Sequence, residues 1–449
     1  MQKSKNKNKK TKYRPTHEDD GYLYEMILDP NDGKTYFVGL VDGEVKIREE
    51  FGDTKPFPAT HDLIAYGAIM LPSEATKYGS QAELITEIQT FIHKYLEVSP
   101  FYEKIATYYV LFTWMYDKFN ELPYLRAIAD FGNGKSRFLK TIGSLCYRPM
   151  VTMGASTVAP IFRILHQFHG TLILDEADIR YSDTNNEIVK ILNVGFQRGQ
   201  PVFRCSAAEY DDVQAFEVFG PKLVATREKY QDQALESRFL VEKMDGSLTR
   251  SDVPINLGDS FGKEALAIRN RCLYWRLENY SKEFQPYRIE DKSIEPRLRQ
   301  IAAPLCGIIE DEAMRNELID FIRTYNNELR DDRGMTDEGE ILEVMIGLAK
   351  EDSGDISINS ITSTYNLRLT TRNQKSEVSN KKVGYIVRHS FNMQNKRANH
   401  GYVVVRESFD REIKKLLVKY NFEDELVNLV NVTGEAEPFV KEMRELGVE

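Results

Sequence analysis

The stretch DFGNGKSRFLKT, residues 130–141, follows a short apolar run, YLRAIA. A phosphate-binding loop has a glycine, four further residues and then Gly-Lys-Ser or Gly-Lys-Thr. Gly134, Lys135 and Ser136 match the end of that pattern, but Ala129 stands where its first glycine belongs. Because Ala129 ends the apolar run, the backbone freedom of a glycine is dispensable there, and we predict a working loop. The alternative is a chance match.

The predicted loop would bind the phosphates of ATP together with Mg²⁺. Its backbone N–H groups would face the phosphates at the start of a helix, where the macrodipole favours negative charge. The ammonium group of Lys135 would reach the β- and γ-phosphates, and the hydroxyl group of Ser136 would bind Mg²⁺. The residues assigned to the ATP site are Gly132, Asn133, Gly134, Lys135, Ser136 and Arg137.

A second motif, TLILDEAD, occupies residues 171–178. Its apolar residues predict a buried strand, and a buried strand that ends in two carboxylates is costly unless these have a function. Downstream of a phosphate-binding loop, Asp175 would hold Mg²⁺ together with Ser136, and Glu176 would polarise the attacking water. The alternative is an ordinary acidic turn after the strand.

The stretch between and around these motifs alternates in pattern. After the loop, helical periodicity and short apolar runs take turns, up to a last apolar run, KLVAT, at residues 222–226. This alternation is typical of a parallel sheet with helices on both faces. KLVAT ends in the polar residue Thr226, and Ser237, Arg238 and Phe239 follow about a dozen residues later.

In the order of these four motifs the chain resembles the AAA+ ATPases, and within them the minichromosome-maintenance-like replicative helicases. It is similar to helicases carried by bacterial mobile elements such as genomic islands and staphylococcal cassettes. The resemblance covers roughly residues 120–310. It implies that Thr226 senses the γ-phosphate, that Arg238 is an arginine finger for a neighbouring subunit, and that the protein forms a ring, a hexamer. The alternative for Arg238 is an ion pair within its own chain.

The resemblance also implies a cationic residue on a helical lid. Arg297 and Arg299, in EPRLRQIAAPL, are the two candidates for this sensor-2 position, and a solvated helix face is the alternative. The chain departs from the family at three points. Thr226 stands where asparagine is usual, the long insert before TLILDE is missing, and the tip of the predicted hairpin, AAEYDD at residues 207–212, is acidic where related proteins carry Lys or Arg.

The C-terminal part predicts a winged helix. Three helical patterns are followed by NMQNKRANHGYVVV, which reads as a β-wing with Gly401 near its tip. Residues 368–400 carry eight Lys or Arg against one acid, Glu377, which is the kind of positive face that phosphate binding requires. A surface for protein contact is the alternative. The residues assigned to nucleic acid are Lys375, Lys381, Lys382, Arg388, Lys396 and Arg397.

The expected fold class is therefore α/β: an AAA+ P-loop core with a helical lid, preceded by a small α+β module and followed by a C-terminal winged helix. Composition shifts give the expected boundaries: a basic disordered tail at 1–20, the N-terminal module at 21–95, the core at 96–250, the lid at 251–330, the winged helix at 335–420 and an acidic tail at 421–449.

Composition limits the remaining possibilities. The net charge is −9, so contacts to nucleic acid must come from local patches. No run of about 18 apolar residues predicts a membrane span. The four cysteines form no CxxC pair, which argues against a zinc site or a disulfide framework and suits a reducing cytoplasm.

These patterns together predict an ATP-driven, ring-forming DNA helicase in the replication of a mobile element or phage-like replicon. Its cofactors would be ATP and Mg²⁺. Its partners would be single-stranded and duplex DNA, further copies of the chain and replication proteins, with no membrane. A second hypothesis is an ATP-switched DNA-binding initiator, loader or transposition regulator that does not unwind DNA.

Overall fold

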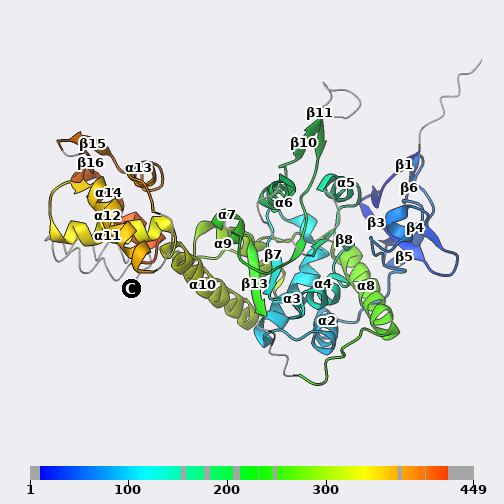
Figure 1. The fold of residues 1–449 in the computed structure, drawn as a ribbon. Helices are drawn as coiled ribbons and strands as arrows, with labels where there is room; N and C mark the ends of the chain where they lie inside the picture. The colour runs from blue at the N-terminus through cyan, green and yellow to red at the C-terminus, as the bar shows by residue number, and fades with distance from the viewer. Residues whose placement is uncertain are drawn as a thin grey trace, which may run out of the picture. The chain divides into compact units, whose positions relative to one another are not determined.

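The computed structural model describes residues 11–152, 158–175, 183–205, 213–230, 232–244, 246, 250–372, 377–399 and 401–422. The chain forms two compact units. The first comprises Met1–Ile289 and Pro296–Ile319, and the second comprises Glu290–Glu295 and Asp320–Glu449 (Figure 1). None of the helices in the described ranges is long and apolar enough to cross a membrane.

The centre of the first unit is a five-stranded sheet in the order β13-β7-β12-β9-β8, and every neighbouring pair is parallel. The strands are β7 (Tyr124–Ala129), β8 (Met150–Thr152), β9 (Leu172–Leu174), β12 (Lys222–Thr226) and β13 (Phe239–Met244). Because β12 lies between β7 and β9, the carboxyl ends of these three strands lie side by side. The loop of residues 130–134, Thr226 and Asp175 therefore meet at one edge of the sheet. This is the α/β arrangement expected for an AAA+ P-loop core.

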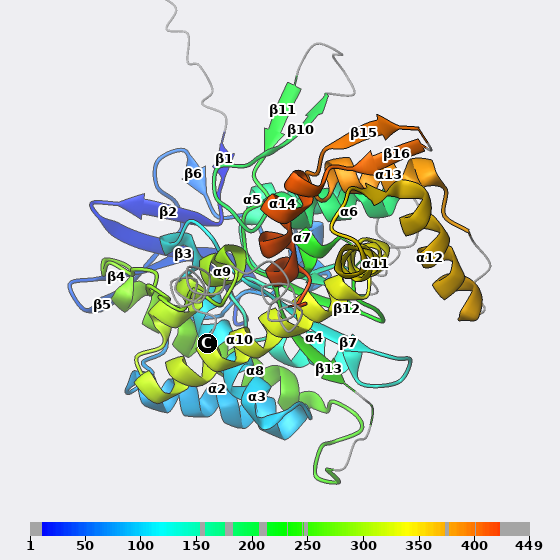
Figure 2. The same cartoon turned by 90° about the vertical axis from the view of Figure 1, so that its left-hand side faces the viewer.

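Helices connect these strands and cover the sheet. They are η1 (Tyr116–Lys118), α3 (Pro100–Thr113), α4 (Lys135–Gly143), α5 (Val158–Phe168), α6 (Asp183–Val194) and the short α7 (Gln233–Glu236). α4 buries Phe138, Leu139 and Ile142 against the sheet, which fixes the end of the helix that follows the loop. The predicted hairpin is present as β10 (Val202–Cys205) and β11 (Val213–Phe216), which extend beyond α5 and α6 (Figures 1 and 2). The acidic tip lies outside the described residues.

The N-terminal module belongs to the same compact unit. It contains an antiparallel sheet in chain order, β2 (Thr16–Asp19), β3 (Tyr22–Asp29), β4 (Lys34–Val41) and β5 (Glu44–Arg48), a parallel pair, β1 (Lys12–Tyr13) and β6 (Thr54–Lys55), and helices α1 (Asp62–Ala65) and α2 (Gln81–Tyr95). The predicted small α+β module is present, but its start was placed too late. β1 and β2 lie within residues 11–20, which the sequence assigned to a disordered tail. Residues 1–10 of that tail lie outside the described part.

The helical stretch after the core is divided between the two units. It contains α8 (Asp259–Asn279), α9 (Pro296–Ile308) and α10 (Glu312–Gly334). α8 packs along α2, where the indole N–H of Trp275 donates to Gln81 at 2.9 Å. α9 packs on α3. α10 gives its first residues to the first unit and the others to the second, so the region expected as one lid, 251–330, does not form one compact body.

The second unit has the expected winged-helix arrangement (Figure 2). Its elements are α11 (Asp337–Glu351), β14 (Ile356–Ser357), α12 (Ile358–Thr371), α13 (Asn380–His389), β15 (Asn395–Ala398), β16 (Gly401–Val404) and α14 (Arg406–Lys419). The strands form an antiparallel sheet in the order β14-β16-β15. α13 begins at the cap residue Ser379, whose hydroxyl accepts the N–H of Lys382, and it buries Val383, Ile386 and Val387 in the unit's core. Residues 423–449, most of the predicted acidic tail, lie outside the described part.

Candidate nucleotide site and nucleic-acid interface

Ala129 is an ordinary strand residue. It is 4% exposed, and it pairs with Met244 across the β7–β13 ladder. The residues that need a left-handed backbone come later in the loop: Gly132 has a φ of 79° and Gly134 a φ of 85°. The glycine missing from the consensus pattern is therefore missing at a position where this backbone does not require one.

The loop and the start of α4 form a concave array of donors. Gly134 is the N-cap of α4 and provides no side-chain cap, so the first N–H groups of the helix are left for another acceptor. Lys135 folds back over the loop, and its Nζ donates to the carbonyls of Ala129 at 2.5 Å and Asp130 at 2.7 Å. Backbone N–H groups and a cation around one concavity are what a phosphate group needs.

Ser136 and Asp175 come together as the sequence predicted. The hydroxyl Oγ of Ser136 donates to Oδ2 of Asp175 at 3.1 Å, although the two residues come from different strand ends. A hydroxyl group and a carboxylate side by side supply the oxygen ligands that Mg²⁺ prefers, with open positions for water and phosphate. Glu176, the predicted water-polarising residue, lies outside the described residues.

Thr226 provides an independent check of this site. It ends β12 between β7 and β9 and is 1% exposed. Its hydroxyl Oγ1 is buried and has no hydrogen-bond partner among the residues that the structure describes. A buried hydroxyl without a partner costs about 1–3 kcal/mol, so an acceptor arriving at this edge would be stabilised. The residues present therefore fit a magnesium-bound nucleotide.

The remaining loop residues act through packing. The guanidinium group of Arg137 donates to the carbonyls of Tyr95, Pro254 and Ile255, so its side chain is turned away and only its backbone N–H serves the loop. Asn133 packs against Gly246, where a Cβ would come within 2.4 Å of the Asn133 side chain. Gly246, with a φ of 78°, lets the residues after β13 press against the loop.

Two residues next to the loop were not predicted. Phe131 is 72% exposed, and the guanidinium of Arg227 lies 3.6 Å from its ring centroid. Lys135 lies 5.8 Å from the same centroid. No motif marks Arg227, but its place directly after Thr226 at the strand end is a signal that could have found it. A second cation therefore lies beside the phosphate-binding loop.

Arg238 lies at the other edge of the sheet. Its carbonyl accepts the N–H of Tyr124, the first residue of β7, whereas the loop follows Ala129 at the far end of that strand. A strand of six residues puts roughly 20 Å between the two edges, more than an arginine side chain spans. Arg238 therefore cannot contact a nucleotide in the loop of its own chain.

The side chains of Arg238 and of the lid candidate Arg297 lie against the same aromatic ring. Both guanidinium groups lie over the ring of Phe196, at 4.7 Å for Arg238 and 4.9 Å for Arg297. Arg238 is 6% exposed, and burial together with the charge of Arg297 lowers its pKa. Buried nitrogen atoms of Arg238, Arg297 and Arg299 have no hydrogen-bond partner among the described residues. Guanidinium groups that lie together and have donors without a partner would be stabilised by a bound anion.

The positive face of the winged helix is smaller than its sequence indicates. Lys382 donates to Asp337 and Lys396 pairs with Asp355, each at 2.6 Å. The hydrogen bond from Lys382 holds the pKa of Asp337 below its ordinary value. Arg368 and Arg372 likewise pair with acids of α11. Lys375 lies outside the described residues.

We give the name α13–wing face to the exposed cations of α13 and the wing that pair with no described acid, together with two exposed tyrosines of the same elements. It comprises Lys381, Tyr385, Arg388, Arg397 and Tyr402, all of them exposed. The two tyrosines, each 58% exposed, were not predicted as contacts. Lys381, Tyr385 and Arg388 share one side of α13 because helix residues four and three apart do so. Charged and aromatic side chains on one helix face suit phosphate and base contacts.

No model of a known protein family matches the chain, and no curated protein matches its sequence. Solved structures with a similar arrangement include the apo NrS-1 C-terminal region (TM-score 0.35, 8% identity, 85% of this chain and 95% of that chain). Others are the JCV helicase (0.25, 8%, 60% and 66%) and the Aeropyrum pernix ORC1 protein in complex with DNA (0.21, 11%, 76% and 98%). Likeness at this level carries no argument about function, which has to be built from the residues themselves.

Proposed function

We propose that the protein hydrolyses ATP at the loop of residues 130–136. The observation that supports this most is the Ser136–Asp175 contact, at 3.1 Å, beside the loop. Lys135 would hold the β- and γ-phosphates in place of the carbonyls it now contacts, and Thr226 would donate to the γ-phosphate. Glu176 would orient the attacking water. Bound Mg²⁺ neutralises charge that develops on the phosphates.

We propose further that each site is completed by another copy of the chain. The support is the position of Arg238 and Arg297 at the edge opposite to the loop, where they cannot serve their own nucleotide. An arginine that enters from a neighbour stabilises the charge of the transition state. A head-to-tail contact of this kind closes into a ring when the rotation permits, and we propose a hexamer.

The proposed work of this ring is the unwinding of DNA in the replication of a mobile element or phage-like replicon. Its support is the order of the motifs together with the winged helix. The α13–wing face would contact DNA through Lys381, Arg388 and Arg397, whereas Lys382 and Lys396 are held by acids of their own unit. Strand displacement on a forked duplex tests this proposal. ATP-dependent release of the strand by the wild type, and none by Lys135→Ala, is the expected result.

A second candidate function is an ATP-switched initiator or loader that binds duplex DNA without unwinding it. One observation favours it. The exposed cations proposed to contact DNA lie on the winged helix. A winged helix can bind duplex DNA without moving along it. In that case the forked duplex stays intact, while DNA binding by the α13–wing face still depends on ATP.

A further inference from the structure

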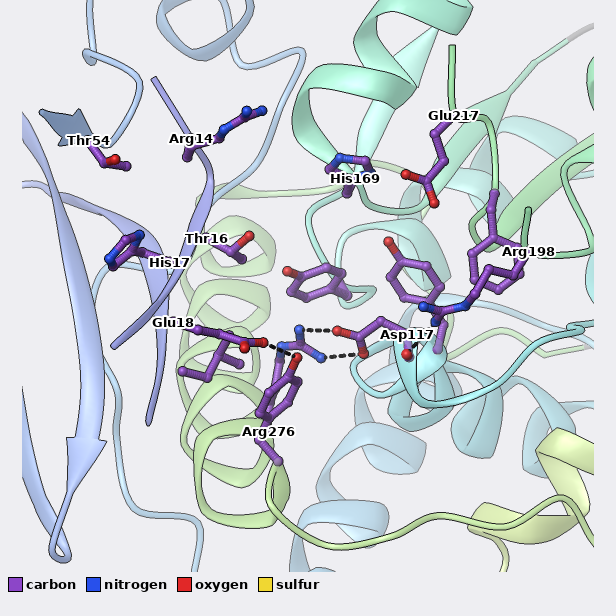
Figure 3. A pocket seen from close by; sticks show the side chains of 15 residues that line it. Arg14, Thr16, His17, Glu18, Thr54, Asp117, His169, Arg198, Glu217 and Arg276 are labelled. Atoms are coloured by element: carbon purple, nitrogen blue, oxygen red, sulfur yellow. Dashed lines mark hydrogen bonds and ion pairs between the residues drawn. The ribbon is translucent and has the colours of Figure 1, made fainter. Parts of the chain in front are cut away.

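A cavity of about 430 Å³ lies at the edge of the central sheet opposite to the phosphate-binding loop (Figure 3). Its walls come from β2, η1, the segments that precede β8, β9 and β12, and α8. All of them belong to the first unit. A volume of this size is typical of sites for small ligands.

Behind the cavity wall lies a buried and balanced charge cluster, of which Asp117 and Arg276 line the cavity. Glu25, 2% exposed, pairs with Arg148 at 2.6 Å and with Arg276 at 2.7 Å. Arg276 also pairs with Asp117 at 2.6 Å. Burial alone would raise the pKa of Asp117, but Arg276 outweighs it and lowers that pKa. Two arginines and two carboxylates balance in formal charge, and their pairing holds Asp117 and Arg276 in the wall.

The rim of the cavity carries two cations, Arg14 and Arg198, that form no ion pair with an acid among the described residues. Arg14 is exposed, and its guanidinium makes no ion pair or hydrogen bond with any residue in the described ranges. Among the described residues, the Arg198 side chain donates only to main-chain carbonyls, those of Asp117 and Phe119, and it stacks over Phe219 at 5.2 Å. Figure 3 shows Arg14, His169 and Arg198 around the same opening.

His169 lies on the rim of the cavity. Its pKa is lowered to about 4, first by burial and then by the positive charges of Arg148 and Arg14, while Asp117 acts in the opposite direction. Two carboxylates also reach the rim: Glu18, which accepts the hydroxyl of Tyr280 at 2.9 Å, and Glu217. The cavity thus offers cations for an anion and separate acceptors for a donor group.

One wall is aromatic and carries an unused donor. The rings of Tyr116 and Phe219 are 5.6 Å apart, and those of Tyr116 and Tyr147 are 6.0 Å apart. Tyr116 is 4% exposed, and its hydroxyl makes no hydrogen bond within the part of the chain that the structure describes. The rings are tilted by 46° and 45° against each other, so they form an apolar corner with one free hydroxyl, which fits the edge of a planar ring that carries a polar group.

We propose that this cavity binds one nucleotide unit, with its phosphate at Arg14 and its base against Tyr116 and Phe219 on the opposite side, next to Arg198 (Figure 3). The unit is a free mononucleotide or one residue of a single-stranded nucleic acid, since both present the same chemistry. This site is separate from the phosphate-binding loop. Glu217 and Phe219 directly follow the β10–β11 hairpin, and β2 lines the other side, so the ligand would join the base of the hairpin to the N-terminal sheet.

The test is binding by the full-length Lys135→Ala protein in EDTA, which silences the loop. Calorimetric titrations use AMP, inorganic phosphate, adenosine and a ten-residue oligo(dT). We expect saturable binding of AMP or of the oligonucleotide, with phosphate and adenosine at least about tenfold weaker because each has half of the contacts. Tighter binding of AMP identifies the free nucleotide as the source, and tighter binding of oligo(dT) identifies the strand.

Variants on this background assign the binding to the cavity. Arg14→Glu should weaken it about tenfold or more, and Tyr116→Phe, which removes only a hydroxyl, by about 2- to 12-fold. Arg48→Glu is the matched control, because it makes the same charge change on β5 of the same sheet, outside the cavity. The change caused by Arg14→Glu is diagnostic even for oligo(dT), which also meets the α13–wing face. No saturable binding, or equal affinities for Arg14→Glu and Arg48→Glu at unchanged melting temperatures, would overturn the proposal.

Discussion

Lys135 and Arg238 stand at opposite ends of two adjacent parallel strands, and their surroundings differ in kind. Around Lys135 the donors are open: a helix start without a side-chain cap, a lysine resting on carbonyls and a threonine hydroxyl without a partner among the described residues. Around Arg238 the cations are stacked on Phe196 and mostly buried. The donors around Lys135 are open to a phosphate, whereas Nη1 of Arg238 already donates to the carbonyl of Ala234, and its buried Nε has no partner among the described residues.

This difference is what an ATP site shared by two copies of the chain would show. A buried guanidinium loses hydration, and the nearby charge of Arg297 lowers the pKa of Arg238 further. An anion brought by a neighbour would offset the cost of this arrangement. The first two predictions test one edge of the sheet each, and the next two concern the winged helix and the stability of the first unit.

The largest effect is expected at the loop. Lys135→Ala should abolish ATP hydrolysis, because in the proposed site the ammonium group of Lys135 binds the β- and γ-phosphates. Steady-state phosphate release measures this. Lys140→Ala is the matched control, since Lys140 is exposed on the same helix and five residues further along it. Hydrolysis by Lys135→Ala at the rate of the control would place the site elsewhere.

The next effect is expected at the opposite edge. Arg238→Ala should lower kcat by about 10³ to 10⁵ if the arginine completes a neighbour's site. Binding of ATP to the loop should stay near the wild-type affinity, because the two edges are roughly 20 Å apart. Parallel titration of a fluorescent ATP analogue separates the two quantities. A normal kcat combined with a lower melting temperature would mean that stacking on Phe196 is the whole role of Arg238.

A smaller effect concerns the α13–wing face. The triple variant with Ala at Lys381, Arg388 and Arg397 should make the slope of log affinity against log salt shallower by roughly two to three units on duplex DNA. Lys382→Ala with Lys396→Ala serves as the comparison. These lysines are already paired with acids, so their loss should change the slope less per residue. Equal changes per residue in the two variants would show that the ion pairs open when DNA binds.

The smallest effect is a pH dependence of stability in the first unit. The pKa of His169 is lowered to about 4 from an ordinary value of 6.5. The unfolded chain therefore takes up this proton near pH 6.5 and the folded chain only near pH 4. Stability should fall as the pH drops through this window, by up to about 3 kcal/mol.

His169→Asn should remove that slope, because asparagine does not titrate and tolerates the φ of 47° at this position. Urea unfolding at pH 7.5 and pH 5 measures the difference, and the same substitution at the exposed His389 is the control. If both variants keep the wild-type slope, His169 is not the group responsible.

The loop, the parallel sheet and the winged helix could be predicted because their signals are local. Spacing identifies Gly134, Lys135 and Ser136, and the alternation of helical and apolar stretches predicts a parallel sheet with helices, but not the order of its strands. The start of the N-terminal sheet was misplaced, because residues 11–20 are mostly polar and charged and form two short strands whose pairing partners lie further along the chain.

Contacts between distant residues could not be read from the sequence. Asp337 and Asp355, which hold Lys382 and Lys396, precede the basic region and do not enter a local charge count. The proximity of Arg238 to Arg297 depends on how α9 packs. The cavity at the opposite edge is formed by many segments that are far apart in the sequence, none of which carries a motif. Tertiary packing decided each of these features.

The central claim is that the loop of one copy works with Arg238 of another, and mixing two inactive variants tests it most directly. Lys135→Ala supplies an intact Arg238, and Arg238→Ala supplies an intact loop. In mixed rings up to roughly a quarter of the interfaces join the two intact halves. The account predicts that the mixture hydrolyses ATP well above either variant alone, with a maximum near equal proportions. A mixture no more active than its components, at concentrations where the wild type is fully active, would contradict it.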